Sequence, residues 1–540
     1  MFADDRFRDY QPANLRKDFI SGITVGIVAI PLGMAFAMAS GVKPEYGIYT
    51  TVIAGLLVAL FGGSRYQVAG PTGAFIPILL AIVLQYGYEK LLIAGFMAGV
   101  ILLLMSFFKL GSLIHYIPRS VTIGFTTGIA VIIFTGQLGN FFGLAELEKR
   151  EFFHENMMLF FKNLPNLNGY SVLTAMIGLL VIITVPRFAP RVPVLLVGLI
   201  IPTLISVLLF PDKVETVGTV FGGIPQALPK FRIPDFTLSA IVDLWQPALV
   251  IAALGAIESL LSAVVADSMT GKRHHSNREL FGQGLANIVA PLFGGIPATG
   301  AIARTATNIR SGAVSPLSSI IHSIFVLVTL LILAPYASHI PLAAMAPLLM
   351  FVAWNMSSYK AFGQLLKFRS SDSLVLITTF LLTVFINLTV AVQAGLLLAV
   401  LSFIKKKSEL LQVNNKKMQS LDLTSHFNYL TFSIKGPLFF GTAQALEQSL
   451  TSTLQSSPRY IILNMKDVTM IDATGEDKLA AFIIGVHKRG SQVLIAGLPD
   501  WGIELFKLSG LYNIIGSESF FPDEEMAIDS LTQINKTAGE

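Results

Sequence analysis

Two short stretches of this chain resemble each other and interrupt otherwise apolar segments. The first is VAGPTGAF at residues 68–75, and the second is IPATGAI at residues 296–302. Each contains Thr-Gly-Ala and follows a Phe-Gly-Gly triplet. The apolar run after each is about 10 to 12 residues, or about 15 to 18 Å of helix, whereas a bilayer core needs about 20 residues. Two broken, half-length segments at matching places in the two halves of a chain predict an inverted repeat with a binding site between the breaks.

The composition places most of the chain in a bilayer. Hydrophobic residues make up 53% of the 540 residues and charged residues only 13%, against about 25% charged residues in soluble domains. We predict fourteen membrane segments, seven in each half, at residues 19–41, 46–62, 68–85, 91–110, 121–144, 172–185, 194–210, 244–266, 280–293, 296–310, 317–333, 343–356, 374–388 and 390–403.

Basic residues at the ends of these segments predict the orientation of the chain. Arg16 and Lys17 precede the first segment, and Lys405, Lys406 and Lys407 follow the last. Both ends of the chain, beginning with residues 1–18, are therefore expected on the cytoplasmic side of the inner (plasma) membrane. Because seven is an odd number, the halves would insert with opposite orientation, and the two breaks would meet near the membrane centre.

The two breaks are candidate helix N-termini, which attract anions through unpaired N–H groups and the positive end of the helix dipole. The glycines would let the backbone approach the anion, and the threonine hydroxyls can donate hydrogen bonds. The alternatives are ordinary Gly-Pro loops at the membrane surface, or small residues that serve packing alone. The predicted anion-binding residues of the breaks are Thr72, Gly73, Ala74, Thr299, Gly300 and Ala301.

The chain changes character after residue 407. Strand-like alternation and helical patterns follow in turn, at residues 429–434, 460–463, 474–487, 492–496 and 502–508. Strands that alternate with helices predict a small α/β domain. We therefore expect an all-α polytopic membrane domain at residues 19–407 and a small cytoplasmic α/β domain at residues 408–540.

Five motifs carry a resemblance to a known family: AIPLGMAFA at 29–37, VAGPTGAF at 68–75, GAIESLLSAVVAD at 255–267, ATGAIART at 298–305 and IDATG at 471–475. In this order and spacing the chain resembles the SulP anion permeases (sulfate permease or solute carrier 26-like proteins), which carry sulfate, bicarbonate, chloride or dicarboxylates. The resemblance implies a core domain of segments 1–4 and 8–11 and a gate domain of segments 5–7 and 12–14. It also implies an elevator-like motion, a homodimer and a C-terminal domain of the STAS type.

Glu258 is an acidic residue inside an apolar segment, and such residues are costly and are functional by default. It can bind Na⁺ or carry a proton, and Ser262 lies one helical turn further on the same face. In the family's sodium-coupled bicarbonate transporters, an acidic residue at this position looks like the cation ligand. The alternative is a neutral Glu258 hydrogen-bonded to a neighbouring helix. We predict cation coupling at Glu258 and Ser262, with Na⁺ and H⁺ both open and no other cofactor.

Arg304, Phe36 and Phe75 complete the predicted anion site. Arg304 lies one turn into the second half-helix, where its charge can attract an anion, and the resemblance places an arginine in the same motif. The alternative is a side chain that reaches to the membrane interface. The two phenylalanines can supply the apolar walls that ligand sites need, or plain packing. The family commonly has Gln after the proline of segment 1 and Tyr four residues later, where this chain has Leu32 and Phe36, so the resemblance does not name the anion.

Other polar residues are expected to be structural. Asp267 is expected to be an interfacial charge, and His274 and His275 are expected to be surface residues of a basic loop rather than a metal site. In the IDATG motif, Ala473 stands where anti-sigma factor antagonists have a phosphorylated Ser. We therefore expect Thr474 to cap a helix rather than to carry a phosphate.

Several function classes have no support in the sequence. Cys is absent, and no nucleotide loop, metal cluster or nucleophile set predicts an enzyme. The net charge of +5 is distributed over segment ends and does not indicate nucleic-acid binding. The expected substrate is a small anion (sulfate, bicarbonate or a C4-dicarboxylate), moved by H⁺- or Na⁺-coupled symport. An uncoupled anion channel or exchanger, a nucleobase permease of the same architecture and a membrane-anchored signalling protein are the alternatives.

Overall fold

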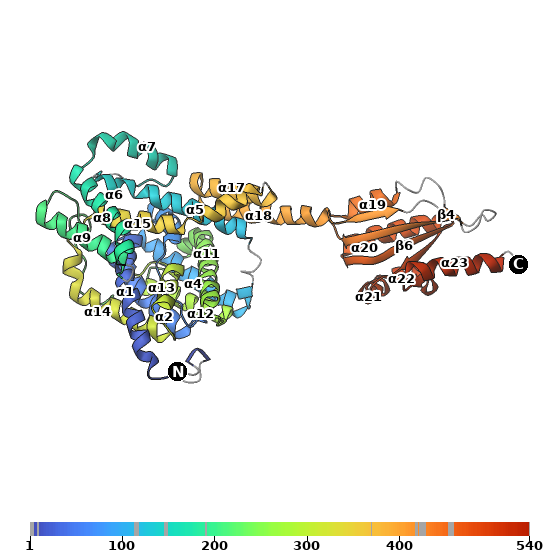
Figure 1. The fold of residues 1–540 in the computed structure, drawn as a ribbon, viewed down its shortest axis with the longest axis horizontal. Coiled ribbons are helices and arrows are strands. Elements are labelled where there is room, and N and C mark those ends of the chain that lie inside the picture. The colour runs from blue at the N-terminus through green and yellow to red at the C-terminus, as the bar shows by residue number, and fades with distance from the viewer. Residues whose placement is uncertain are drawn as a thin grey trace. The chain divides into compact units, whose positions relative to one another are not determined.

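The structure is a computed structural model, and it describes residues 5–7, 10–112, 118–144, 149–189, 192–368, 370–415, 419–420, 428–451 and 458–538. The chain forms two compact units, Met1–Leu397 and Leu398–Glu540. The first unit is a bundle of helices, and the second contains a sheet with helices against it (Figure 1).

Each predicted membrane segment corresponds to a helix or half-helix in the described part of the chain. Nine helices among the described residues are long and apolar enough to cross a membrane. In chain order the fourteen elements are α1 (Asn14–Ala39), α2 (Pro44–Phe61), η2 with α3 (Gly73–Phe75 and Ile76–Tyr86), α4 (Tyr88–Phe107), α5 (Arg119–Gly136), α8 (Gly169–Phe188), α9 (Val194–Leu209), α11 (Leu238–Thr270), α12 (Ser276–Leu292), α13 (Ile302–Arg310), α14 (Leu317–Ala337), α15 (Leu342–Met356), α17 (Ser371–Phe385) and α18 (Leu388–Ser408).

Five short elements outside the predicted segments were not predicted, because none has an apolar run of membrane length. They are η1 (Asp5–Phe7), α7 (Phe153–Asn163), η4 (Leu164–Asn166), α10 (Val217–Phe221) and α16 (Tyr359–Lys367). A further short helix, α6 (Leu138–Phe142), lies at the end of the predicted segment 121–144.

The membrane helices pack in two groups. The first helix group contains α1, α2, α4, α11, α12 and α14 together with both half-helices, and the second contains α5, α6, α8, α9, α15 and α17. Glycines allow close approach within the first group: a Cβ on Gly47 of α2 would lie 1.9 Å from the carbonyl oxygen of Gly33 on α1. A Cβ on Gly99 of α4 would likewise lie 2.7 Å from the carbonyl oxygen of Gly284 on α12. Small residues at such crossings increase packing contacts where the lipid supplies no hydrophobic driving force between helices.

The two breaks meet as a pair of short strands. β1 (Ala69–Gly70) and β2 (Thr299–Gly300) are antiparallel, with Ala69 opposite Gly300 and Gly70 opposite Thr299. Without water in the hydrocarbon region, unpaired backbone groups cost several kcal/mol each, so pairing is a physical requirement for extended chain at this depth. This pairing fixes the two halves of the chain to each other at the centre of the first helix group.

The two half-helices begin differently. Thr72 immediately precedes η2, which continues into α3 as the sequence predicted. The prediction that Thr299 and Gly300 begin the second half-helix is wrong, because they form β2, whereas Ala301 is the N-cap of α13, which starts at Ile302. Strand pairing with β1 takes precedence over helix formation there.

The second unit contains a sheet in the order β3-β5-β6-β7-β8, with β4 also beside β5. Strands β5 to β8 are parallel, whereas β3 and β4 run antiparallel to β5. The elements are β3 (Gln412–Asn415), β4 (Gln419–Ser420), β5 (Asn428–Leu438), α19 (Ala443–Thr451), β6 (Tyr460–Ile471), α20 (Ala473–Lys488), β7 (Gln492–Ala496), α21 (Asp500–Ser509), α22 (Leu511–Ile515), η5 (Ser517–Ser519), β8 (Phe520–Phe521) and α23 (Glu524–Ala538).

Alternating apolar residues give this sheet two buried faces. In β5, Leu430, Phe432 and Ile434 pack with residues of α19 to α22, whereas Tyr429 packs on the opposite face with Leu531 of α23. The predicted fold class, an all-α polytopic domain followed by a small α/β domain, is confirmed.

The IDATG motif forms the turn from β6 into α20. Asp472 is the N-cap of this helix: its Oδ1 accepts from the amide of Gly475 at 2.8 Å, and its Oδ2 accepts from the amide of Phe440 at 3.0 Å. The prediction that Thr474 caps the helix is wrong, since a carboxylate two residues earlier already does so.

Candidate anion-binding site

Helices of both halves hold the paired strands in place. Thr50 of α2 donates from Oγ1 to the carbonyl of Ile296 at 3.0 Å. Asn287 of α12 both donates to the carbonyl of Ala298 and accepts from its amide, each at 2.8 Å. These side chains satisfy the backbone that leads into β2, so the interrupted segment is stable inside a membrane.

Several groups of the predicted anion site are already hydrogen-bonded. The amide of Ala301 donates to the carbonyl of Val68 at 2.9 Å. Ser259 of α11 contacts two further groups of the site. Its Oγ accepts a hydrogen bond from the amide of Gly300 and lies 2.9 Å from the Thr299 hydroxyl. The second break is therefore mainly a structural junction up to residue 301.

Free amides begin one residue later. In the described part of the chain, the amides of Gly73, Ala74, Ile302 and Ala303 have no assigned acceptor. They belong to the first turns of the two half-helices, where the dipoles are positive. The groups available to an anion therefore include these four amides, of which the sequence predicted the first two.

Glu258 lies against the start of the first half-helix. Its side chain is 9% exposed, and its Oε2 accepts a hydrogen bond of 3.0 Å from Thr72 Oγ1. The described residues contain no cluster of three or more His, Cys, Asp or Glu side chains that could hold a metal ion. A cation here would be held by one carboxylate with hydroxyl and carbonyl oxygens, a hard oxygen set that suits Na⁺ rather than a transition metal.

Ser262 serves a different contact from the one predicted. Its hydroxyl donates to Gln67 Oε1 at 2.9 Å and to Thr305 Oγ1 at 3.2 Å, and no described contact joins it to Glu258. Gln67 Nε2 in turn donates to the carbonyl of Ser259 at 3.0 Å. The structure therefore places Ser262 in a buried network behind the strands and does not bring it together with the predicted cation site.

Arg304 lies behind the first break. It is 2% exposed, and its Nη2 donates to the carbonyl of Pro71. Its guanidinium packs against Gly70, where a Cβ would lie 2.6 Å from Nη1. A side chain buried in this way does not reach the membrane interface, so the snorkelling alternative does not apply. The charge of Arg304 instead adds a fixed positive potential beside Thr72.

Both predicted phenylalanines are buried near the half-helices. Phe36 is 5% and Phe75 is 1% exposed. A Cβ on Gly73 would lie 3.6 Å from the ring of Phe36 and 3.2 Å from Ile133 of α5, so the start of the first half-helix faces the second helix group. The ring of Phe75 instead packs against Gly255 of α11. Phe36 thus lies where an apolar wall would be needed, and Phe75 is packed into the helix group.

The basic loop after α11 contains one residue that was misjudged. Asp267 Oδ2 lies 2.7 Å from Nδ1 of His274, whose side chain is only 7% exposed. The prediction that His274 is a surface residue is therefore wrong, whereas His275 is exposed. This pair closes the loop at the end of α11 and lies apart from the strands.

Sequence reasoning missed the buried polar residues that support the strands. Gln67, Asn287 and Thr305 all make buried hydrogen bonds to strand backbone or to one another through Ser262. For Asn287 and Thr305 the available signal was a polar residue inside an apolar segment, the same signal that identified Glu258, whereas Gln67 precedes its segment and gave no such signal.

The helices and the polar site together define a multi-pass membrane protein whose two broken helices meet between its halves. The family model described as the sulfate permease family matches residues 15–379, and the one described as the STAS domain matches residues 420–527. The chain belongs to the sulfate permease family and carries a STAS domain, as the motifs indicated.

Its relatives are named as transporters rather than as enzymes. The chain is 50% identical over 517 residues to "Putative sulfate transporter YvdB" of Bacillus subtilis, which covers 96% of this chain and 98% of that protein. It is 31% identical to "Bicarbonate transporter BicA" of Picosynechococcus over 80% of each chain.

Solved structures show the same fold. The transmembrane domain of a cyanobacterium bicarbonate transporter BicA matches with a TM-score of 0.64 and 30% identity, over 72% of this chain and 97% of that one. The overall structure of SLC26A9 matches with a TM-score of 0.86 at 19% identity, over 99% of this chain and 93% of that one.

Proposed function

We propose that this protein is a secondary active transporter of small oxyanions, with sulfate as the first candidate and coupling to H⁺ or Na⁺. The observation that carries the proposal is the hydrogen bond of 3.0 Å between Thr72 Oγ1 and Glu258 Oε2. It ties a buried carboxylate to the start of a half-helix that has free amides. The sulfate name of the B. subtilis relative supports sulfate, and the BicA name keeps bicarbonate as the second candidate.

The anion would bind at the N-termini of both half-helices. The free amides of Gly73, Ala74, Ile302 and Ala303 can each donate a hydrogen bond, and both helix dipoles favour negative charge there. Arg304 adds its charge from behind β1 without occupying the site.

Coupling follows from the charge of Glu258. An ionised carboxylate beside Thr72 repels an anion at the neighbouring amides, and a proton or a Na⁺ on Glu258 removes that repulsion. Anion and cation therefore increase each other's affinity by the same factor, which favours their transport together. Na⁺ would bind the carboxylate oxygens and the Thr72 hydroxyl, whereas a proton needs only the carboxylate.

Movement would occur between the two helix groups. We take the first helix group as the mobile core and the second as the gate, because the first contains both half-helices and Glu258. Gly73 lies close to Ile133 and Met356 of the second group, so the site lies where the groups meet. An elevator-like displacement of the core would move the bound ions past these residues.

The remaining parts of the proposal concern the setting. We propose an inner (plasma) membrane location with both ends of the chain cytoplasmic, since Lys405, Lys406 and Lys407 follow the last segment. A homodimer is the expected assembly, and the STAS domain would serve dimerisation or regulation because Ala473 replaces the phosphorylated Ser of the antagonists.

The test is sulfate uptake into proteoliposomes under an inward proton gradient and, separately, an inward Na⁺ gradient. Wild type should accumulate sulfate under one of them. Glu258→Gln should lose gradient-driven accumulation while it keeps exchange of sulfate across the membrane, because a neutral amide imitates the cation-loaded state. Glu45→Gln is the matched control, since Glu45 is also buried in the first helix group, at 6% exposure, but lies on α2.

The outcomes separate the alternatives. Normal accumulation by Glu258→Gln would show that the coupling assignment is wrong. Sulfate flux in wild type that follows neither gradient would indicate an uncoupled channel or exchanger. Uptake of bicarbonate or a C4-dicarboxylate but not sulfate would keep the site and change the substrate, and uptake of a nucleobase alone would overturn the anion assignment.

A further inference from the structure

A lysine joins the two helix groups at the end of α1. Lys149 lies on the connection between α6 and α7, and its Nζ donates to the carbonyl oxygens of Met38 at 2.8 Å and Ala39 at 3.3 Å. These are the last carbonyls of α1, where the helix dipole is negative. On the topology proposed above, this end of α1 faces the outside of the cell.

The charge of Lys149 is not neutralised by any described carboxylate. Burial is the single cause that lowers its pKa to about 8, and no nearby charge contributes. Backbone carbonyls are weaker partners for an ammonium than an anion is, because a hydrogen bond between two ions is about twice as strong as one between neutral groups. Lys149 is thus a partly buried cation that would gain from an anionic ligand.

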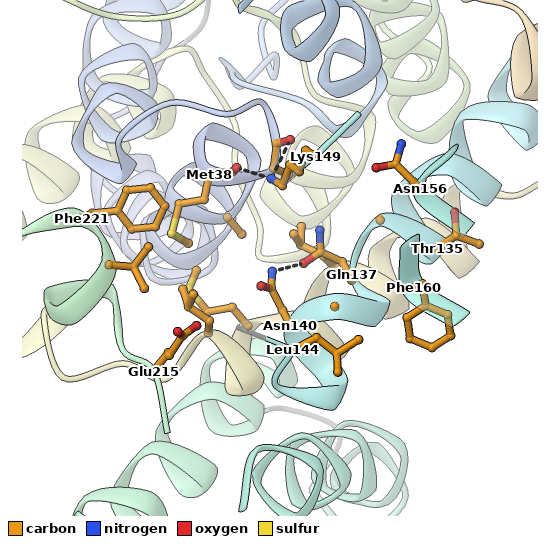
Figure 2. A pocket seen from close by; sticks show the side chains of 18 of the residues that line it. Met38, Thr135, Gln137, Asn140, Leu144, Lys149, Asn156, Phe160, Glu215 and Phe221 are labelled. Atoms are coloured by element: carbon orange, nitrogen blue, oxygen red, sulfur yellow. Dashed lines mark hydrogen bonds between the residues drawn. The ribbon is translucent and has the colours of Figure 1, made fainter. Parts of the chain in front are cut away.

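A cavity of about 400 Å³ opens beside this ammonium, a size within the range of ligand sites. Figure 2 shows Lys149 at its wall, and the amide side chains of Gln137, Asn140 and Asn156 also line the cavity. Asn140 donates to Gln137 at 3.2 Å. Gln137 Nε2 and the second N–H of Asn140 make no described hydrogen bond and can turn toward a small oxyanion, whereas both N–H groups of Asn156 donate to the carbonyls of Arg150 and Phe152 at 2.8 Å.

Among the residues that the structure describes, few other charged groups line the cavities beside Lys149. Glu215 also lines this cavity, but Figure 2 shows it at the opposite end of the lining from Lys149. A second cavity of about 400 Å³ on the other side of Lys149 is lined by Arg150, Glu151 and Asp243. These carboxylates make no described ion pair with Lys149, and their negative charge would keep anion binding weak.

We propose that Lys149 is the cation of an outer binding site for a small inorganic anion, which competes with the α1 carbonyls for its ammonium. With an anion bound, α1 is released from the connection between α6 and α7, and the first helix group is free to move. Without an anion, the contact holds the two groups together on the outside. The site is separate from Glu258, and the inference rests on the proposed function because it needs the outer location.

The test measures the reactivity of Lys149 from outside. Intact cells that express the full-length protein are treated at pH 8 with a membrane-impermeant acetylating reagent, and acetylation is quantified by peptide mass spectrometry. Sulfate should slow modification of Lys149 severalfold relative to gluconate, because a paired ammonium is not nucleophilic. Lys90 is the internal control, since its side chain is 39% exposed and already pairs with Asp243 at 3.5 Å.

Glu258→Gln should show the same protection even where its transport is lost, so this result is independent of the coupling role proposed for Glu258. Equal modification of Lys149 in sulfate, bicarbonate and gluconate would overturn the proposal. Absence of modification under every condition would also overturn it, because the site has to open to the outside.

A transport measurement provides the second readout. Lys149→Gln should raise the half-saturation concentration for external sulfate about tenfold, because one hydrogen bond to a charged group changes an affinity by at least about that factor. The half-saturation concentration for internal sulfate should stay unchanged. Lys149→Arg keeps the charge and should stay close to wild type. An equal rise on both sides, or none, would show that Lys149 has a purely structural role.

Discussion

The strongest prediction concerns Gly300→Ala in β2, the strand that pairs with β1. A Cβ at this position would lie 1.7 Å from Nε2 and 2.6 Å from Cδ of Gln67, and 3.1 Å from the backbone of Ser259. The backbone of Gly300 cannot withdraw, because it pairs with Ala69. The amide of Gln67 must therefore leave its position.

The magnitude follows from the hydrogen bonds of Gln67. Its Nε2 donates to Ser259 and its Oε1 accepts from Ser262, and the residue is 2% exposed. Each buried polar group left without a partner costs roughly 1–3 kcal/mol. Loss of both bonds should therefore lower the free energy of unfolding of the membrane unit by about 2–6 kcal/mol. Anion binding should also weaken, because strain at Gly300 would displace the start of α13, which begins at Ile302.

A double-mutant cycle measures whether this reasoning is right. Gly300→Ala, Gln67→Ala and the double variant are purified in detergent, and their thermal inactivation midpoints are compared with that of Gly363→Ala, where a Cβ meets open space. Gly300→Ala should be strongly destabilised in the wild-type background and should cost little more once the Gln67 side chain is gone. Additive effects, or a Gly300→Ala protein as stable as wild type, would refute the close contact between Gly300 and the Gln67 side chain.

Three further predictions test other parts of the molecule. Gly47→Ala should prevent folding, as judged by gel filtration, because its Cβ would meet the Gly33 carbonyl at 1.9 Å; a monodisperse variant would contradict the packing of α1 on α2. Asp472→Ala should cost about 1–2 kcal/mol and speed hydrogen exchange at the start of α20 in the full-length protein, while Thr474→Val should not; equal effects would show that the wrong cap was assigned. The pKa of Lys149, lowered to about 8, leaves its ammonium charged below that pH and neutral above it. The external half-saturation concentration for sulfate should therefore rise as external pH increases through about 8, and a curve that is flat between pH 7 and 9 would contradict this.

The sequence predicted the architecture well, because long apolar runs and basic connections are determined by the bilayer rather than by tertiary contacts. It also predicted where the chain breaks. It did not predict that Thr299 and Gly300 form a strand, since a two-residue strand has too little alternation to be detected and depends on a partner in the other half.

The side-chain network was less predictable for the same reason. Ser262 was assigned to Glu258 by helix spacing, which orders residues along one face but does not show what lies opposite that face. The actual partner, Gln67, comes from a segment 195 positions away. Asp472 and Thr474 illustrate a local failure: both are acceptable caps, and only the geometry of the turn shows which oxygen reaches the amide.

The antiparallel pair of β1 with β2 has a consequence for how the protein is made. The amide of Val68 donates its hydrogen bond to the side chain of Thr305, which lies 237 positions further along the chain and is therefore synthesised later. At ordinary translation rates that delay is roughly 10 to 50 s, during which the first break has no native partner. A nascent chain of this kind would need its open backbone shielded by the insertion machinery or by water at the membrane surface. Ribosome pausing between the two halves should therefore be more damaging to yield than pausing after residue 310.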